Sequence, residues 1–164
     1  MRFELEHTLP GAVDAVLAAF TSPGFLASLG ELGKVGEPEV LDQHRDGNTV
    51  RQRVRYRFTG ELSPAVTTVV DRKKLVWVDE HVYDLANATA TFRIIPENYA
   101  DRLKCSGSEW FGEAGTSTTR HLEAELTVRW PIVGGLVERA IVSGLQEHLA
   151  EETRLLAKWM AGPG

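Results

Sequence analysis

Apolar and polar residues alternate along most of the chain, and this period of two predicts strands. The clearest run is 48–58, where Val50, Gln52, Val54, Tyr56 and Phe58 share one face and four arginines occupy the other. Asp46-Gly47-Asn48 is a turn signal in front of it, so 37–58 reads as a hairpin. Further strands are predicted over 2–8, 75–83, 88–95, 102–112 and 116–130. The connections are too short for parallel crossovers, so the strands must be antiparallel.

Helical spacing appears in the remaining segments. Pro10 opens a short helix that extends to Phe20, and Ser22-Pro23 starts a second one. A third short helix over 64–70 is left open because of its valine and threonine content. Residues 132–161 carry an apolar stripe at 3/4 spacing from Val133 to Met160, which predicts one long helix. Strands and a helix that each carry apolar residues on one face must bury those faces against each other.

These elements predict one α+β domain over residues 1–164. It consists of a roughly seven-stranded antiparallel sheet, two short helices after the first strand, and one long C-terminal helix packed across the sheet. The formal net charge of −5, with acids and bases interleaved, argues against nucleic acid as a partner. Cys105 is the single cysteine and no apolar stretch approaches a bilayer span, so we expect a cytoplasmic protein without an integral membrane segment. The composition leaves the oligomeric state open.

The element order, together with residues at both ends, resembles the helix-grip fold of the START and polyketide-cyclase superfamily, which includes the birch-pollen-allergen type. At the C-terminal end the likeness is carried by the run Val128–Glu138, with its Trp130-Pro131 and Gly134-Gly135 pairs, and by the helix end with Glu151-Glu152-Thr153 and Lys158-Trp159. At the opening it is carried by the first strand followed by Leu9-Pro10-Gly11-Ala12-Val13 and then Phe20, Pro23 and Phe25. Within that superfamily the chain is most similar to an uncharacterised subfamily. The resemblance implies a cavity between the sheet and the long helix that holds a lipid, sterol, polyketide or other apolar ligand. It does not imply a reaction.

The strand 75–83 poses a question of parity that decides the candidate catalytic residues. If Val76, Val78 and Val82 face inward, Glu80 faces inward with them, and a desolvated carboxylate there is suited to acid–base chemistry. With the other parity, Trp77, His81 and Tyr83 face the cavity. The valine face is the more apolar of the two, which favours Glu80 inside. Glu80 and His81 are therefore the catalytic candidates.

Polar residues on other apolar faces are candidates for ligand contact. Gln52 and Tyr56 need partners when buried, from a ligand or, as we favour, from a hydrogen bond within the core. On the long helix, Leu145 and Leu149 continue the apolar stripe, and His148 and Glu152 interrupt it. Those two could hold a ligand's hydroxyl or carboxyl group, although water is the favoured partner. The predicted ligand-binding residues are Gln52, Tyr56, Glu80, Leu145, His148 and Leu149.

Small residues raise two further alternatives. Gly144 lies on the stripe of the long helix, where it leaves room either for a strand or for a ligand. In 102–112, Leu103 and Cys105 indicate one inward parity and Trp110 indicates the other, so Ser106-Gly107-Ser108 is a candidate for a bulge that changes the parity midway.

Standard enzyme motifs are missing from the sequence. It has no phosphate-binding glycine loop, no His-Glu-x-x-His, no cysteine pair for a metal and no nucleophile elbow, so we expect neither a metal nor a cofactor. Three hypotheses follow: a binding or transport module for a small hydrophobic ligand, a cofactor-independent enzyme of the cyclase or dehydratase kind, or a partner-binding domain without a functional cavity. Whether any reaction is catalysed stays open.

Overall fold

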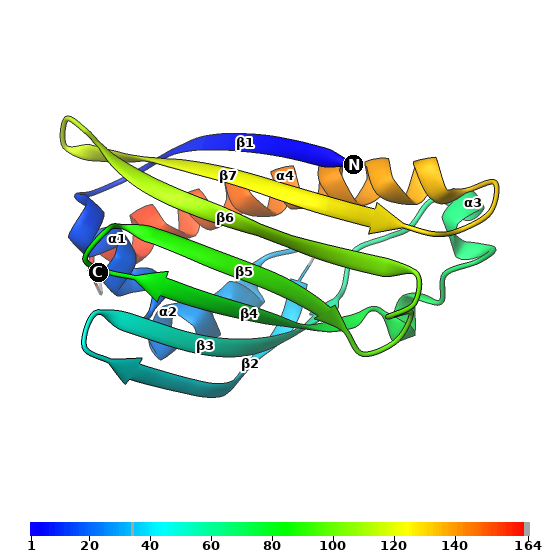
Figure 1. Ribbon diagram of the computed structural model, residues 1–164, viewed down its shortest axis with the longest axis horizontal. Coiled ribbons are helices and arrows are strands. Elements are labelled where there is room, and N and C mark those ends of the chain that lie inside the picture. The colour runs from blue at the N-terminus through cyan, green and yellow to red at the C-terminus, as the bar shows by residue number, and fades with distance from the viewer. Residues whose placement is uncertain (34, 163–164) are drawn as a thin grey trace.

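Seven antiparallel strands form one sheet in the computed structural model, which describes residues 1–33 and 35–162 (Figure 1). The strands lie in the order β1-β7-β6-β5-β4-β3-β2, so the two strands of every neighbour pair except β1 and β7 follow one another in the sequence. The strand bounds are β1 Arg2–Leu9, β2 Val35–Asp46, β3 Thr49–Phe58, β4 Val76–Asp84, β5 Thr89–Pro96, β6 Leu103–Ala114 and β7 Ser117–Val128.

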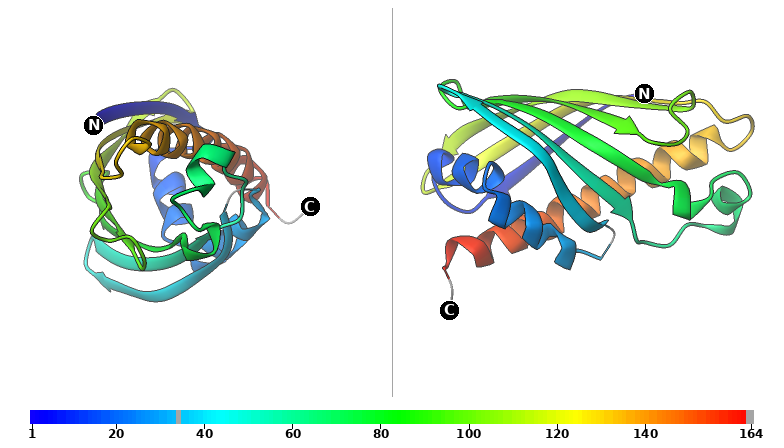
Figure 2. Two further views of the ribbon diagram at one scale, coloured as in Figure 1. Left: turned by 90° about the vertical axis from the view of Figure 1, so that its right-hand side faces the viewer. Right: turned by 90° about the horizontal axis from the view of Figure 1, so that it is seen from below.

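Four α-helices accompany the sheet: α1 Val13–Phe20, α2 Pro23–Ser28, α3 Pro64–Thr67 and the long α4 Gly134–Met160. Single 3-10 turns lie at Leu29–Glu31 and Arg72–Lys74. The sheet curls around α4, which runs obliquely along its concave side (Figure 2). α1 and α2 lie at the end where the chain terminates, and α3 lies at the opposite end, beside the start of α4 (Figures 1 and 2).

The predicted elements are confirmed, with boundaries that differ by a few residues. The short helix proposed for 64–70 forms over Pro64–Thr67, where the Ser63 hydroxyl accepts a hydrogen bond from the backbone N–H of Val66. The long helix buries Leu156, Leu149 and Val137 against the sheet side. No single helix in the described ranges has the length and apolarity to cross a membrane, although the bent pair Val13–Phe20 and Pro23–Glu31 meets those two criteria together.

Register settles the parity of β4, and the prediction that Glu80 faces inward is wrong. Gln52, on the buried face of β3, pairs with His81, so His81 faces the concave side. Glu80 lies on the outer face, where its carboxylate contacts Arg53 at 3.2 Å and Arg93 at 2.9 Å. The prediction failed because apolar side chains can also be buried on the outer face, where long neighbouring side chains cover them. Val78 lies there between Arg55 and Ile95 and is only 6% exposed.

The predicted bulge in β6 is also absent, because the β6–β7 register runs without a shift from Leu103 to Ala114. Gly107 instead makes room for a neighbour. An added Cβ would lie 2.2 Å from the Glu123 carbonyl oxygen and 2.8 Å from the ring of Phe92, which leans across this position. The small residue therefore serves packing between strands.

Gly107→Ala is accordingly expected to destabilise the protein by about 1–3 kcal/mol, because the β6–β7 pair would have to move apart. Gly112→Ala in the same strand is the matched control, since its added Cβ meets nothing within 4 Å. The free energy of unfolding in urea measures both. Equal effects of the two substitutions would contradict the packing role of Gly107.

Candidate functional site

A cavity of about 420 Å³ lies between the concave face of the sheet and α4. Its wall is mostly apolar and is supplied by β3 to β7, α4 and the short helices. At the α3 end several wall residues are also exposed to solvent, namely Glu61, Ser63, Lys74 and Asn98, and we call this end the mouth. The volume is within the range of roughly 300–1,000 Å³ that is typical of small-molecule sites.

Charged side chains cross the far part of this wall in one connected series, which we call the charged row: Asp79, His81, Glu109, Arg120 and Glu152. Nδ1 of His81 lies 2.6 Å from Asp79 Oδ1, and its Nε2 lies 2.9 Å from Glu109 Oε1. Glu109 Oε2 is 3.5 Å from Arg120 Nε. The guanidinium then donates from Nη1 and Nη2 to one oxygen of Glu152, at 2.7 and 2.9 Å. The row thus links β4, β6, β7 and α4.

Three members of the row, His81, Glu109 and Arg120, are held by their neighbours in a charged form. Burial alone would lower the pKa of His81, but Asp79 and Glu109 outweigh it and raise the pKa to about 10. Burial would raise the pKa of Glu109, yet Arg120 and His81 hold it below its ordinary value. Basic and acidic side chains alternate along the row, with His81 between Asp79 and Glu109 and Arg120 between Glu109 and Glu152.

Aromatic rings pack around the row. The His81 ring lies between those of Tyr83 and Phe92, with centroid distances of 5.2 and 5.5 Å. Arg120 lies over the ring of Phe20 at 5.1 Å and is only 4% exposed. Buried charges of this kind are costly unless they are paired, which explains why the row is continuous.

Three buried nitrogens, one in the row and two on other residues, have no hydrogen-bond partner among the described residues: Nε of Arg120, Nδ1 of His148 and Nδ1 of His7. His148 lies on the cavity wall, and its other ring nitrogen is 3.9 Å from Glu152. His7 faces Arg120 across the β1–β7 pair, and burial followed by the charge of Arg120 lowers its pKa. Unpartnered buried polar atoms are uncommon, and here they cluster around one guanidinium.

The predicted ligand-contact residues, Glu80 excepted, line the cavity: Gln52, Tyr56, Leu145, His148 and Leu149. The Gln52 amide is hydrogen-bonded within the protein, since its NH₂ donates to the Phe20 carbonyl and its oxygen accepts from the Gln43 amide. It anchors the end of α1 to the sheet. Tyr56 stacks against Trp77 and is 8% exposed, and burial raises the pKa of its hydroxyl well above the ordinary value.

His148 and Glu152 do not turn to water as the sequence favoured. Both lie against the cavity, with side chains 16% and 12% exposed. Gly144, one turn before His148, also lines the cavity, and an added Cβ would meet nothing within 4 Å. The gap beside Gly144 is therefore cavity space and does not accommodate an approaching strand.

Sequence reasoning overlooked Asp79, Glu109 and Arg120. A signal for them existed, because each continues the inward face of its strand: Asp79 precedes His81 by two residues, and Arg120 precedes Leu122 by two. They were missed because charged residues are usually exposed, so inward positions were expected to be apolar. Their pairing depends on three strands and a helix that are far apart in the sequence.

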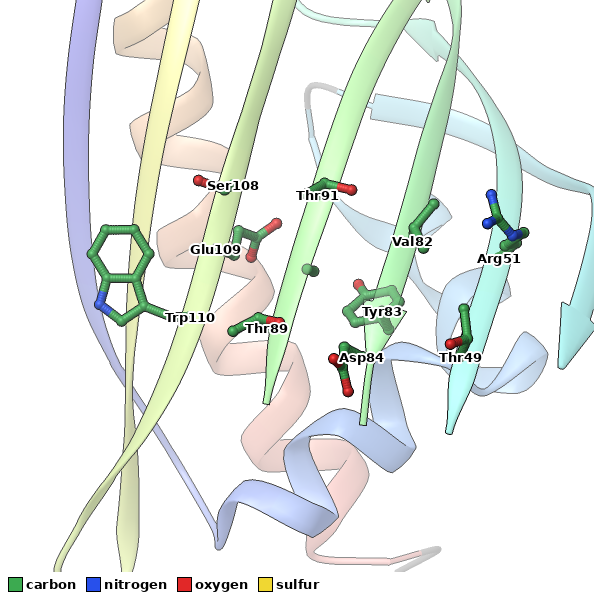
Figure 3. Close-up of a pocket in the computed structure, with 11 residues that line it drawn as sticks. Thr49, Arg51, Val82, Tyr83, Asp84, Thr89, Thr91, Ser108, Glu109 and Trp110 are labelled. Carbon is green, nitrogen blue, oxygen red and sulfur yellow. The ribbon is translucent and has the colours of Figure 1, made fainter. Parts of the chain in front are cut away.

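A second depression, of about 500 Å³, lies on the outer face of the sheet, which Figure 3 shows with α4 behind it. Its floor consists largely of short side chains, including Thr91 and Ser108, with Arg51 and Trp110 at opposite borders (Figure 3). It is an open hollow on the convex side and does not share the apolar enclosure of the internal cavity.

Comparisons with known proteins agree with this architecture. Residues 4–160 match the family described as "Protein of unknown function (DUF2505)". The chain belongs to this family. No curated protein matches this DUF2505 member at a significant level.

Several solved structures have a similar fold. The protein TTHA0849 from Thermus thermophilus aligns with a TM-score of 0.69 and 21% identity, over 99% of this chain and all of that one. Norcoclaurine synthase from Thalictrum flavum aligns with a TM-score of 0.66 and 16% identity, over 98% and 96% of the two chains. The ZhuI aromatase/cyclase from Streptomyces sp. R1128 aligns with a TM-score of 0.60 and 16% identity, over 94% of each chain. At these identities the likeness establishes the helix-grip fold of this DUF2505 member.

Proposed function

We propose that this protein binds a small, mostly apolar molecule, such as a lipid-like or polyketide-like compound, inside the cavity between the sheet and α4. The observation that carries the proposal is an apolar cavity of about 420 Å³ with one localised polar region on its wall. Apolar lining with a few convergent polar groups is the usual design of a small-molecule site. The structural neighbours, an aromatase/cyclase and a norcoclaurine synthase, support a ligand-holding use of the fold.

The polar end of the cavity indicates one property of the ligand. Arg120 Nε carries a hydrogen that none of the described residues accepts, and His148 offers a second unpartnered nitrogen nearby. A ligand hydroxyl would meet both needs, because its oxygen accepts from Nε of Arg120 and its hydrogen can be donated to Nδ1 of His148, whereas a carbonyl oxygen would accept from Arg120. We therefore expect an apolar body that extends toward the mouth and an oxygen that reaches Arg120 or His148.

Substitution at Gly144 tests the binding. Gly144→Phe would place a ring in the empty space and is expected to weaken binding of a fluorescent fatty acid at least about tenfold, because ring and probe compete for one volume. Gly144→Ala is the matched control: it fills little space and should stabilise α4 by about 1 kcal/mol. Fluorescence titration measures the affinities, and native mass spectrometry of the freshly purified wild type shows any molecule that co-purifies.

Two results would contradict the proposal. One is equal probe binding by the wild type and by Gly144→Phe, which would place the probe outside the cavity. The other is a wild-type protein that neither retains an apolar molecule during purification nor binds the probe.

Catalysis without a cofactor is the second candidate, favoured by the titratable groups on an apolar wall. His81 is poorly suited to proton transfer because carboxylates hold both of its ring nitrogens, and Glu80 lies outside the cavity. His148, with one unpartnered nitrogen and Glu152 beside the other, has the better geometry for an acid or base. A His148→Gln variant that binds a cyclisable aromatic precursor but no longer converts it, as measured by mass spectrometry, would identify such a role.

A further inference from the structure

The corner between β7 and α4 presents apolar side chains to solvent at the mouth of the cavity. Ile132 has its side chain fully exposed, with a relative accessibility of 103%, and Leu136 is 41% exposed in the first turn of α4. Val69, which follows α3, is 37% exposed. α3 and the corner pack together through Val66, Val70, Trp130 and Val137, so these exposed residues lie at one end of the molecule (Figures 1 and 2).

Ile132 is also held in an unfavourable backbone conformation. Its φ is +70°, a region that β-branched residues rarely adopt because Cβ approaches the following carbonyl. Full exposure means that the side chain packs against none of the described residues in compensation for this strain. A strained residue that presents an apolar side chain to solvent indicates a contact outside the protein.

Positive charge surrounds the same corner, although the whole chain carries −5. Seven cations belong to segments at this end: Arg72, Lys73, Lys74, Arg102, Lys104, Arg129 and Arg139. Over the described ranges none of them forms an ion pair. Glu61, Asp71, Asp101 and, in β7, Glu125 are the acids near this end that also lack an ion pair among the described residues, whereas Glu97 pairs with Arg55 and Glu138 with the N-terminal amine. The end therefore carries a net positive charge.

We propose that this end docks on an anionic lipid surface, with Ile132 and Leu136 entering the interface and the cations contacting the headgroups. Apolar side chains flanked by unpaired bases are the combination that such a surface binds. Docking there would bring the cavity mouth against the lipid, so that an apolar ligand could pass between them without crossing water. This part of the inference rests on the proposed function, because it assumes that the cavity binds an apolar ligand and adds that the ligand comes from the lipid layer.

Vesicle sedimentation tests the docking. The wild type is expected to bind vesicles of phosphatidylcholine containing about 30 mol% phosphatidylserine more tightly than phosphatidylcholine alone, and to be released by salt. Ile132→Gly should weaken binding about tenfold, the effect of losing one inserted side chain. Its thermal midpoint should be unchanged or higher because glycine tolerates a positive φ. Leu41→Ser is the control, since Leu41 is also an exposed apolar residue, at 38%, but lies on the edge strand β2.

The outcomes separate docking from ligand binding. Vesicle affinity of Gly144→Phe equal to that of the wild type is expected, because neither Ile132 nor Leu136 is among the residues that line the cavity. Docking is refuted if the wild type does not sediment with anionic vesicles, or if Ile132→Gly binds them as tightly as the wild type does. It is also refuted if light scattering shows a dimer that Ile132→Gly converts to a monomer, because the corner would then serve a second copy of the chain.

Discussion

Arg120→Met is expected to destabilise the protein by about 3–5 kcal/mol, the effect of removing one partner from a buried ion pair. Arg120 is 4% exposed and lies between Glu109 and Glu152, whose side chains are 6% and 12% exposed. Methionine fills a similar volume but leaves two carboxylates close together without the cation between them. The free energy of unfolding in urea at neutral pH measures the loss.

Two variants make this result specific. Arg120→Met combined with Glu152→Gln should recover part of the stability, because it removes one of the two uncompensated charges. Arg93→Met is the surface control: Arg93 also contacts a carboxylate, that of Glu80, but it is 67% exposed, so the loss should be at most about 1 kcal/mol. A loss below about 1 kcal/mol for Arg120→Met itself would show that water reaches the charged row.

Alkaline pH is expected to destabilise the protein through His81. Its pKa is raised from 6.5 to about 10 in the folded state, since Asp79 and Glu109 outweigh the effect of burial. A raised pKa contributes stability that is fully present below about pH 6.5 and is lost as the pH rises through about 10. At about 1.4 kcal/mol per unit of pKa, the contribution is at most about 5 kcal/mol. Glu109 has the opposite sign: its lowered pKa contributes stability that is lost in acid.

Two measurements test this expectation. The ring resonances of His81, followed by NMR from about pH 6 to about pH 11, should show an imidazolium at about pH 8 and a transition near pH 10. The free energy of unfolding should decrease over the same alkaline range. His81→Gln, although less stable at neutral pH, should lose the part of the alkaline slope that His81 causes. A His81 ring that titrates near its ordinary pKa of about 6.5 would contradict the paired geometry of the row.

The candidate site could be predicted only in part. Gln52, Tyr56, Leu145, His148 and Leu149 were found because each lies on an element with a clear apolar face, and the cavity lies on that side. Glu80 was misplaced because β4 carries apolar residues on both faces, so period and composition could not decide its parity. Only the register with β3, which pairs Gln52 with His81, decides it.

What the sequence determined by itself is the set of elements and their order. Hydrophobic period is a local property, and turns such as Asp46-Gly47-Asn48 punctuate it, so the strands and the long helix could be located without any contact between them. The tertiary structure decided which polar groups meet inside. Asp79, Glu109, Arg120 and Glu152 are distant in the sequence, and strand register together with the position of α4 brings them into one row. Buried charges are tolerated only as a set, and no single position in the sequence shows that its partners will be there.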